Sequence, residues 1–462
     1  MRSVNQNRGP TGILAEYIAA ACYEDIAAEV REKVKILILD SLGCSIGGSM
    51  LKPGKMILHF FEGLDGTPES TVYATGKRIP CIHAAYVNST LSNMLDMDDT
   101  LIDKGIGHPG ATVVPPALAV AEKTGAGGRE VINAVLLGYD VSLRILNGLA
   151  PTPERRRQVW GLATFQIFGA VTASCKLLGL NADQIASAFG LAGFCAPVPS
   201  VRKMGTDQRP TNWLKNNFGW ASMGGVMSSL QASMGIQGST SILDGEKGFW
   251  IMAGSDRCDF DALTQGLGDN YQLEKLSFKR YASCRFTHTT LDALRKIKAD
   301  NEVSPKNITK IEVKTFYEAY KFKTYRGLNI IEAQFSLPYV IALELLDRSP
   351  SQGLREEDLG DNEVLNIADL VSLELDPKAD KLFVEEHLML SSITIWMRDG
   401  RVFSGSADIP KGDVKKPLSN EEIQEKFRNI VGPLFGVEKT EEIIEVCKNL
   451  DVAKGSFKIP TP

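Results

Sequence analysis

Apolar residues recur at helical spacing through roughly the first 270 residues of the chain. Segments with apolar side chains at i, i+3 and i+4 include 13–21, 26–43, 116–124, 131–149 and 165–178. This is the pattern of helices that bury one face, and alternation of the strand type is scarce here. The segments are also rich in Gly, Ala and Ser, which lets helices approach closely. The pattern restricts this part of the chain to a large helical domain.

The pattern changes near Leu276. Residues 311–315 alternate Ile, Val and Thr with Glu and Lys, the period of two that a half-buried strand shows. Further on, two short apolar runs within residues 393–403 flank Asp399-Gly400, a strong signal for a hairpin turn. These features predict a sheet in this part of the chain.

Helical spacing appears again within and after the predicted strands. Residues 335–346 have the composition of a buried helix, and Ser419 with Glu422 three residues later forms a capping box before a final helical pair. We expect a mainly α protein with a helical domain of residues 1–275 and 410–462. A smaller α+β lid domain, residues 276–409, is inserted before the C-terminal helices.

Composition excludes several classes of protein. The 462 residues are too many for one core, and 51 Lys plus Arg against 56 Asp plus Glu do not suggest a nucleic-acid partner. No apolar run approaches the ~20 residues that span a bilayer, and residues 1–12 do not resemble a signal peptide. The eight cysteines are scattered without a CxxC pair. We expect a cytoplasmic protein with reduced cysteines, no metal, no nucleic-acid partner and no membrane contact.

Motifs for nucleotides and for a serine nucleophile are missing. No GxGxxG follows a strand, and neither a P-loop nor a GxSxG is present. Five histidines occur in the chain, so acid–base chemistry has few candidate imidazoles. The sequence therefore predicts neither of these nucleotide-binding sites nor a serine nucleophile of this type.

The stretch from Asp96 to His108 is the most informative. Asp96 and Thr100 are four residues apart, which predicts one face of a helix, and three of residues 96–99 are aspartate. Because helix interiors disfavour Asp, the run indicates either a helix end or a functional task. His108 precedes a helical segment, where free N–H groups favour anions. The set suits proton transfer on a carboxylic acid, with a structural polar cluster as the alternative.

Five segments resemble motifs of the MmgE/PrpD family, which holds 2-methylcitrate dehydratase, cis-aconitate decarboxylase and iminodisuccinate epimerase. They stand in the order of the family: 96–100 (DMDDT), 108–115 (HPGATVVP), 212–215 (NWLK), 281–288 (YASCRFTH) and 332–338 (EAQFSLP). Chance is a poor explanation for five ordered matches. The resemblance extends at lower specificity over nearly the whole chain.

The resemblance implies roles for matching residues. Asp96, Thr100 and His108 correspond to the first catalytic cluster, Lys215 to a catalytic or substrate-binding lysine, and His288 to a histidine of the second domain. We expect these residues to meet in one cleft between the two domains.

Two further positions remain open. Arg285, three residues before His288, is either a carboxylate clamp or part of a salt bridge. The family tyrosine of the second domain corresponds to Tyr320 or to Tyr325.

One position departs from the family. Decarboxylases and epimerases of this type carry a histidine nine residues before a Gly-Ala pair, and the same count from Gly169 leads to Trp160. Indole does not exchange protons at neutral pH. Trp160 is therefore expected to line the substrate pocket and make it less polar, unless it only packs a helix.

The resemblance implies a cofactor-independent lyase, a dehydratase or decarboxylase, acting on a small polycarboxylate by acid–base chemistry. An epimerase or isomerase of a substituted dicarboxylate is the second hypothesis. A homologue with altered catalysis and a less polar substrate, or a silent scaffold, is the third. The expected partners are a small carboxylate substrate and a second copy of the chain, bound through the helical domain.

Overall fold

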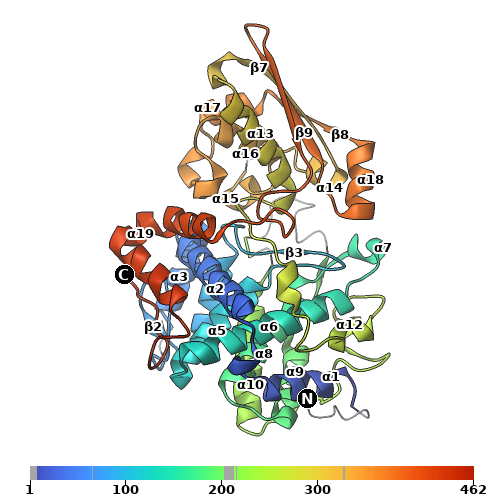
Figure 1. The fold of residues 1–462 in the computed structure, drawn as a ribbon, viewed down its shortest axis with the longest axis vertical. Coiled ribbons are helices and arrows are strands. Elements are labelled where there is room, and N and C mark those ends of the chain that lie inside the picture. Colours follow the sequence, from blue (N-terminus) through green and yellow to red (C-terminus); the bar gives the residue numbers. More distant parts are fainter. Residues whose placement is uncertain (1–7, 65, 202–212, 215, 326–327) are drawn as a thin grey trace. The chain divides into compact units, whose positions relative to one another are not determined.

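The structure is a computed structural model that describes residues 8–64, 66–201, 213–214, 216–325 and 328–462. The chain divides into two compact units. The helical unit comprises residues up to 94, 98–276 and 423–462, and the α+β unit comprises 95–97 and 277–422. The fold is mainly helical with one small mixed sheet, as Figure 1 shows, which confirms the predicted fold class.

The helical unit is built around α8. Its longer helices are α1 Pro10–Ala20, α2 Ala28–Gly48, α3 Lys52–Glu62, α4 Cys81–Ser92, α5 Gly110–Thr124, α6 Gly128–Gly148, α8 Leu162–Leu177, α9 Ala182–Cys195 and α10 Phe218–Ser233. Short helices α7 Pro153–Arg156, α11 Phe249–Met252 and α12 Phe260–Thr264 connect them. Helix α8 packs against α5, α6, α9 and α10. It is almost fully buried, which explains its continuous apolar sequence.

Small residues allow these helices to approach closely. A Cβ at Gly225 of α10 would lie 2.6 Å from the Cβ of Ala170 on α8. A Cβ at Gly169 of α8 would lie 2.7 Å from Val113 Cγ2 of α5. Real Cβ atoms do not approach to such distances, so the Gly- and Ala-rich composition is a requirement of this packing.

The C-terminal segment forms α19, Asn420–Lys448. Ser419 and Glu422 exchange the two hydrogen bonds of the predicted capping box, at 2.8 and 3.2 Å. Gly436 has φ +76°, so two helices meet at a kink there, as the predicted helical pair required.

The α+β unit carries a four-stranded sheet in the order β10-β9-β7-β8. The strands are β7 Ile308–Thr315, β8 Val371–Leu375, β9 Ser391–Met397 and β10 Val402–Ala407, and only the β7–β8 pair is parallel. Alternate residues of β9 are buried, because α13 His288–Asp300 packs on β9 and β10. The β9–β10 hairpin turns at Gly400, φ +90°, as predicted.

The remaining helices of this unit are α14 Tyr317–Tyr320, α15 Ile330–Ala333, α16 Leu337–Leu345, α17 Asn362–Ala368 and α18 Pro377–Glu386. Every residue of α16 is buried, which confirms the predicted buried helix.

Within the described ranges, no single helix is long and apolar enough to span a membrane. Helices α2 and α3 together have the length and apolar composition of a membrane span, but the axes of the two helices differ by 86°.

Candidate active site

The aspartate-rich stretch is a turn that follows α4, so the prediction of a helix face shared by Asp96 and Thr100 is wrong. Helix α4 ends at Ser92, and Asp96 has φ +54°, in the left-handed region. The Asn93 amide donates to both oxygens of Asp98 at 2.9 and 3.0 Å. Side chains of Asn and Asp that bond locally in this way favour turns over helix. The run thus follows the end of a helix, and a functional task for it stays a prediction.

Asp96 belongs to a buried cluster in the α+β unit. Lys279 Nζ donates to the Asp96 carbonyl oxygen at 3.0 Å and lies 3.3 Å from Asp96 Oδ2. The side chains are 2 and 4% exposed. A buried pair of this kind holds the carboxylate in one place. Sequence reasoning missed Lys279, because no spacing or composition marks a lysine as buried.

His288 is the first residue of α13 and is fully buried. Its Nε2 lies 3.2 Å from the Ser283 carbonyl oxygen, and its ring meets the edge of Tyr281 at 5.0 Å. Burial, reinforced by Arg285 and Lys279, lowers the pKa of His288 well below its usual range. Since a carbonyl only accepts, we assign the proton to Nε2, which leaves a lone pair on Nδ1.

Arg285 is held by groups of the protein itself. It donates to the carbonyl oxygens of Phe278 and Lys411 at 3.2 and 3.3 Å and lies 3.5 Å from the Asp413 carboxylate. Burial lowers the pKa of Arg285 to about 10, although Asp413 and Asp292 oppose the shift. The contacts favour the salt-bridge interpretation of Arg285 over the substrate clamp.

The two candidate tyrosines are half-buried. Tyr320 ends α14, with Lys323 Nζ 5.0 Å from the centre of its ring. Tyr325 lies beyond α14, next to residues outside the described ranges. The contacts do not separate the two candidates.

His108 belongs to a second cluster, in the helical unit. The side chain of Gln166 on α8 accepts from the His108 N–H at 2.9 Å and donates to its carbonyl oxygen at 2.7 Å. Nδ1 of the imidazole lies 3.0 Å from the Asp99 carbonyl oxygen and 3.5 Å from Asp98 Oδ2. These acceptors favour a proton on Nδ1, which makes Nε2 the basic nitrogen. Gln166, a polar residue in an apolar helix, could have been found from the sequence.

Asp99 occupies the N-terminus of α5. The Gly110 N–H donates to Asp99 Oδ1 at 2.9 Å, and the Tyr139 hydroxyl donates to Oδ2 at 2.7 Å. Burial raises the pKa of Asp99 to about 7, although these hydrogen bonds act against the shift. The protein's own Asp99 carboxyl group therefore accepts a hydrogen bond from the N–H of the first residue of this helix.

Thr100 forms a hydrogen bond across the hairpin that precedes His108. Its hydroxyl donates to the Gly107 carbonyl oxygen at 3.1 Å, across β3 Leu101–Ile102 and β4 Ile106–Gly107. The side chain is buried. In this structure Thr100 fixes the backbone immediately before His108.

Two of the predicted site residues, Lys215 and Trp160, are not fully among the residues that the structure describes. Lys215 lies outside the described residues. Trp160 is described in its backbone, which forms β5 Val159–Trp160 antiparallel to β6 Ser200–Val201.

A small pocket of ≈ 40 Å³ adjoins β5 in the helical unit. Ile106, Leu146, Leu162 and Phe165 form apolar walls, and Lys104 and Arg156 are its charged lining residues.

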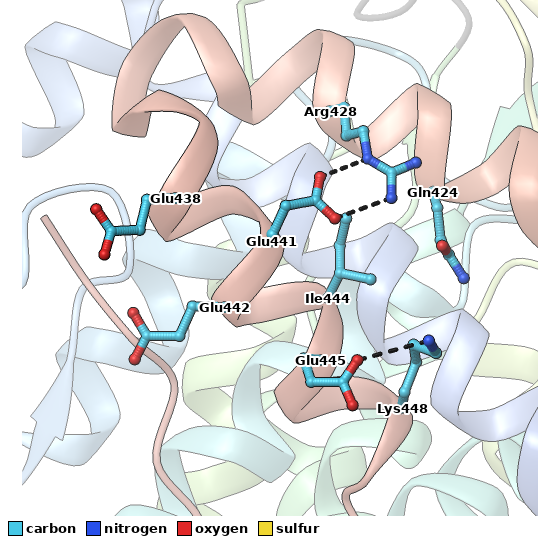
Figure 2. Close-up of a pocket in the computed structure, with 8 residues that line it drawn as sticks. All are labelled: Gln424, Arg428, Glu438, Glu441, Glu442, Ile444, Glu445 and Lys448. Carbon is cyan, nitrogen blue, oxygen red and sulfur yellow. Dashed lines mark hydrogen bonds and ion pairs between the residues drawn. The ribbon is translucent and has the colours of Figure 1, made fainter.

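A larger pocket, ≈ 480 Å³, lies along α19 in the helical unit. Figure 2 shows Arg428 paired with Glu441, and Lys448 paired with Glu445. Glu438 and Glu442 also line it. Its acids outnumber its cations, so it does not suit a carboxylate substrate. Within the described part of the chain, no group of three or more His, Cys, Asp or Glu side chains could hold a metal ion.

The helical unit contains a buried aspartate–histidine pair, and the α+β unit contains a buried aspartate–lysine pair. The protein is thus a two-unit protein with acid–base groups in both units. The MmgE/PrpD N-terminal domain matches residues 12–259, and the MmgE/PrpD C-terminal domain matches residues 281–451. The chain belongs to the MmgE/PrpD family.

Known relatives are similar along nearly their whole length. The chain is 24% identical to the cis-aconitate decarboxylase of Homo sapiens over 432 residues, 91% of this chain and 88% of the relative. It is 23% identical to the cis-aconitate decarboxylase of Aspergillus terreus over 478 residues, 97 and 94% of the two chains. A cis-aconitate decarboxylase-like protein of Aspergillus oryzae is 22% identical over 471 residues, 96 and 95% of the two chains.

Proposed function

We propose that the protein is a cofactor-independent lyase, a decarboxylase or dehydratase, acting on a small polycarboxylate by acid–base chemistry. The observation that carries the proposal is the His108 site. Gln166 fixes the backbone of His108 on both sides, and Asp98 and the Asp99 carbonyl hold Nδ1. An imidazole held in this way can exchange a proton through Nε2. The cis-aconitate decarboxylases among the relatives support the substrate class.

The chemistry follows from these groups. In a decarboxylation, the bond from carbon to one carboxylate breaks and CO2 leaves. The electron pair stays on carbon, conjugated with a neighbouring carboxylate, and protonated His108 delivers the proton. In a dehydration, a base removes a proton next to a carboxylate, and the hydroxyl leaves as water after protonation. Cations such as Lys215 and Lys279 would stabilise the negative charge that develops.

We propose that the His108 and Asp96 clusters act on the same substrate. The covalent chain supports this, because one residue separates Asp96 from Asp98 and their Cα atoms lie at most about 7 Å apart. His288, buried and neutral, would position this region or accept a proton through Nδ1. The cleft predicted for Asp96, His108, Lys215 and His288 stays a prediction.

A product screen in heavy water tests the proposal. The protein is incubated with cis-aconitate, citrate, 2-methylcitrate and substituted succinates, and substrates and products are followed by ¹H NMR. Loss of CO2 or water with deuterium at the reacting carbon is expected, and His108→Gln should abolish it. Deuterium exchange without net conversion would indicate the epimerase or isomerase. Neither exchange nor turnover with any of these compounds would contradict the proposal and favour the scaffold hypothesis.

A less polar substrate is the second candidate. The pocket beside β5 has mainly apolar walls, and Trp160 is a residue of β5. An alkyl arm would gain roughly 0.8 kcal/mol for each CH2 that it buries there. The same screen, extended to alkyl-substituted succinates and citrates, distinguishes the two candidates.

We also propose that the protein acts in the cytoplasm as a homodimer formed through the helical unit. Large apolar side chains are exposed there on or beside three elements: Phe194 at 86%, Met234 at 82% and Met252 at 52%. A contiguous apolar face made by such side chains would be a surface that another chain covers.

A further inference from the structure

The C-terminal return of the chain places a lysine against the second helix. A Cβ at Gly43 of α2 would lie 2.8 Å from Phe427 of α19, so the glycine allows the two helices to touch. The preceding residue, Lys426, is buried, and its Nζ lies 2.6 Å from Asp40 Oδ1 of α2. Asp40 is 3% exposed, and its Oδ2 accepts no hydrogen bond from the described residues.

This Asp40–Lys426 pair lies beside the groups that hold His108. Ser41, the neighbour of Asp40, has its hydroxyl 3.4 Å from the Gly110 carbonyl oxygen, and the Gly110 N–H donates to Asp99. The residue next to Asp40 therefore contacts the first residue of α5, and that residue also binds the Asp99 carboxyl group.

The charges of these groups influence one another. Burial lowers the pKa of Lys426, but Asp40 and, more weakly, Cys44 and Asp98 outweigh it, so the net shift is upward. Burial raises the pKa of Asp40, Lys426 opposes this, and Asp98 adds to it. Because Asp98 acts on both members, the pair also lies within electrostatic reach of the Asp98–His108 contact.

The balance of charge in this region depends on few groups. Asp40, Asp98 and Asp99 are buried carboxyl groups, and Lys426 is a buried cation on which Asp40 and Asp98 act. Lys33 of α2 is half-buried. Burial lowers the pKa of Lys33, and the charges of Asp99 and Asp40 act against this shift. Burial raises the pKa values of Cys44 and Tyr139 well above their usual ranges, so both stay neutral near pH 7.

A buried ion pair is a weak source of stability, because desolvation cancels much of the attraction. Its field, however, is poorly screened and reaches neighbouring groups. We propose that Asp40 and Lys426 are positioning residues for the proton transfer at His108, and that their opposite charges set how readily its imidazole binds a proton. This inference rests on the proposed function of His108.

The test is an NMR titration of protein labelled with ¹³C at histidine Cε1. The His108 signal is assigned with His108→Gln, and no substrate is added. Asp40→Asn leaves the Lys426 charge uncompensated, so the His108 midpoint should fall by about 0.5–1 pH unit. Lys426→Met leaves Asp40 unpaired, so the midpoint should rise, but by a smaller amount, because burial raises the pKa of Asp40 and part of its negative charge is lost. The double variant should return close to the wild-type value.

Arg428→Met is the matched control, because Arg428 is an exposed cation on α19 two residues further on, paired with Glu441. It should leave the His108 midpoint unchanged. Asp40→Asn and the double variant keep the test valid if Lys426→Met does not fold. Shifts in Asp40→Asn no larger than in Arg428→Met would overturn the inference. A wild type without turnover would instead contradict the proposed function, since the titration needs no substrate.

Discussion

Lys279 Nζ lies 3.3 Å from Asp96 Oδ2 and donates to the carbonyl oxygen of the same residue at 3.0 Å. One ammonium group thus holds both the side chain and the backbone of Asp96. The backbone there has φ +54°, which costs energy for any residue with a Cβ. The contacts compensate for this conformation, and they keep the carboxylate where the resemblance to the family places a catalytic group.

Replacing Asp96 separates the role of its charge from that of its backbone. Asp96→Asn keeps a side chain that tolerates positive φ, so the protein should fold while turnover falls by about 100-fold or more. Asp96→Ala should unfold about 1 kcal/mol more easily than Asp96→Gly, because alanine is strained at this φ. Denaturation midpoints and kcat measure the two effects. Equal stability of the Ala and Gly variants would show that the strain is absent.

Asp99 should make stability depend on pH. Its pKa is raised from 3.8 to about 7, so the folded state keeps a proton that the unfolded state loses between these values. Stability from this group is fully present below pH 3.8 and is lost as pH rises toward 7. Three pKa units correspond to at most about 4 kcal/mol. Asp99→Asn should flatten this slope and stabilise the protein at pH 8, measured by urea unfolding from pH 4.5 to 8.

Tyr139→Phe is the companion variant. The Tyr139 hydroxyl donates to Asp99 and lowers its pKa. Without it, the pKa of Asp99 rises further, so the loss of stability should continue to higher pH than in the wild type. A wild-type curve with the same slope as Asp99→Asn would contradict the raised pKa.

Periodicity predicted the two-part fold, because burial of one helix face or one sheet face leaves its period in the sequence. It placed the start of α5 at residue 116 rather than Gly110, since Pro115 and Pro116 lie within the helix and resemble a helix start. Periodicity could not predict the contacts between buried charged residues. Lys279 meets Asp96 across 183 positions of sequence, and Lys426 meets Asp40 across 386. No local pattern encodes such pairs.

Lys215 should bind a substrate carboxylate. Lys215→Met is expected to lower kcat/KM by the equivalent of roughly 2–4 kcal/mol, because a charge-assisted contact in a desolvated site has about that value. The thermal midpoint should stay unchanged. Lys55→Met is a suitable control, since Lys55 is an exposed lysine on α3. Normal turnover in Lys215→Met would make Lys215 a surface residue without a role in catalysis.

The helical unit should form a C2 dimer with a total interface above ~2,000 Å². Light scattering at micromolar concentration is expected to give twice the chain mass. Phe194→Glu and Met234→Glu introduce charge at exposed apolar positions, and at least one should weaken the dimer. Val384→Glu, at an exposed position of the α+β unit, should leave it intact. A monomeric wild type would exclude the dimer.

Trp160 should determine which substrate the protein prefers. Its backbone lies in β5, and its neighbours Val159 and Gly161 line the apolar pocket. Because indole cannot exchange protons and imidazole can, Trp160→His should lower turnover of the natural substrate and raise turnover of cis-aconitate. Trp160→Phe is the control, since it keeps an aromatic ring without a titrating group. It should retain the natural reaction and gain nothing with cis-aconitate. Unchanged rates with both substrates in Trp160→His would assign Trp160 to helix packing.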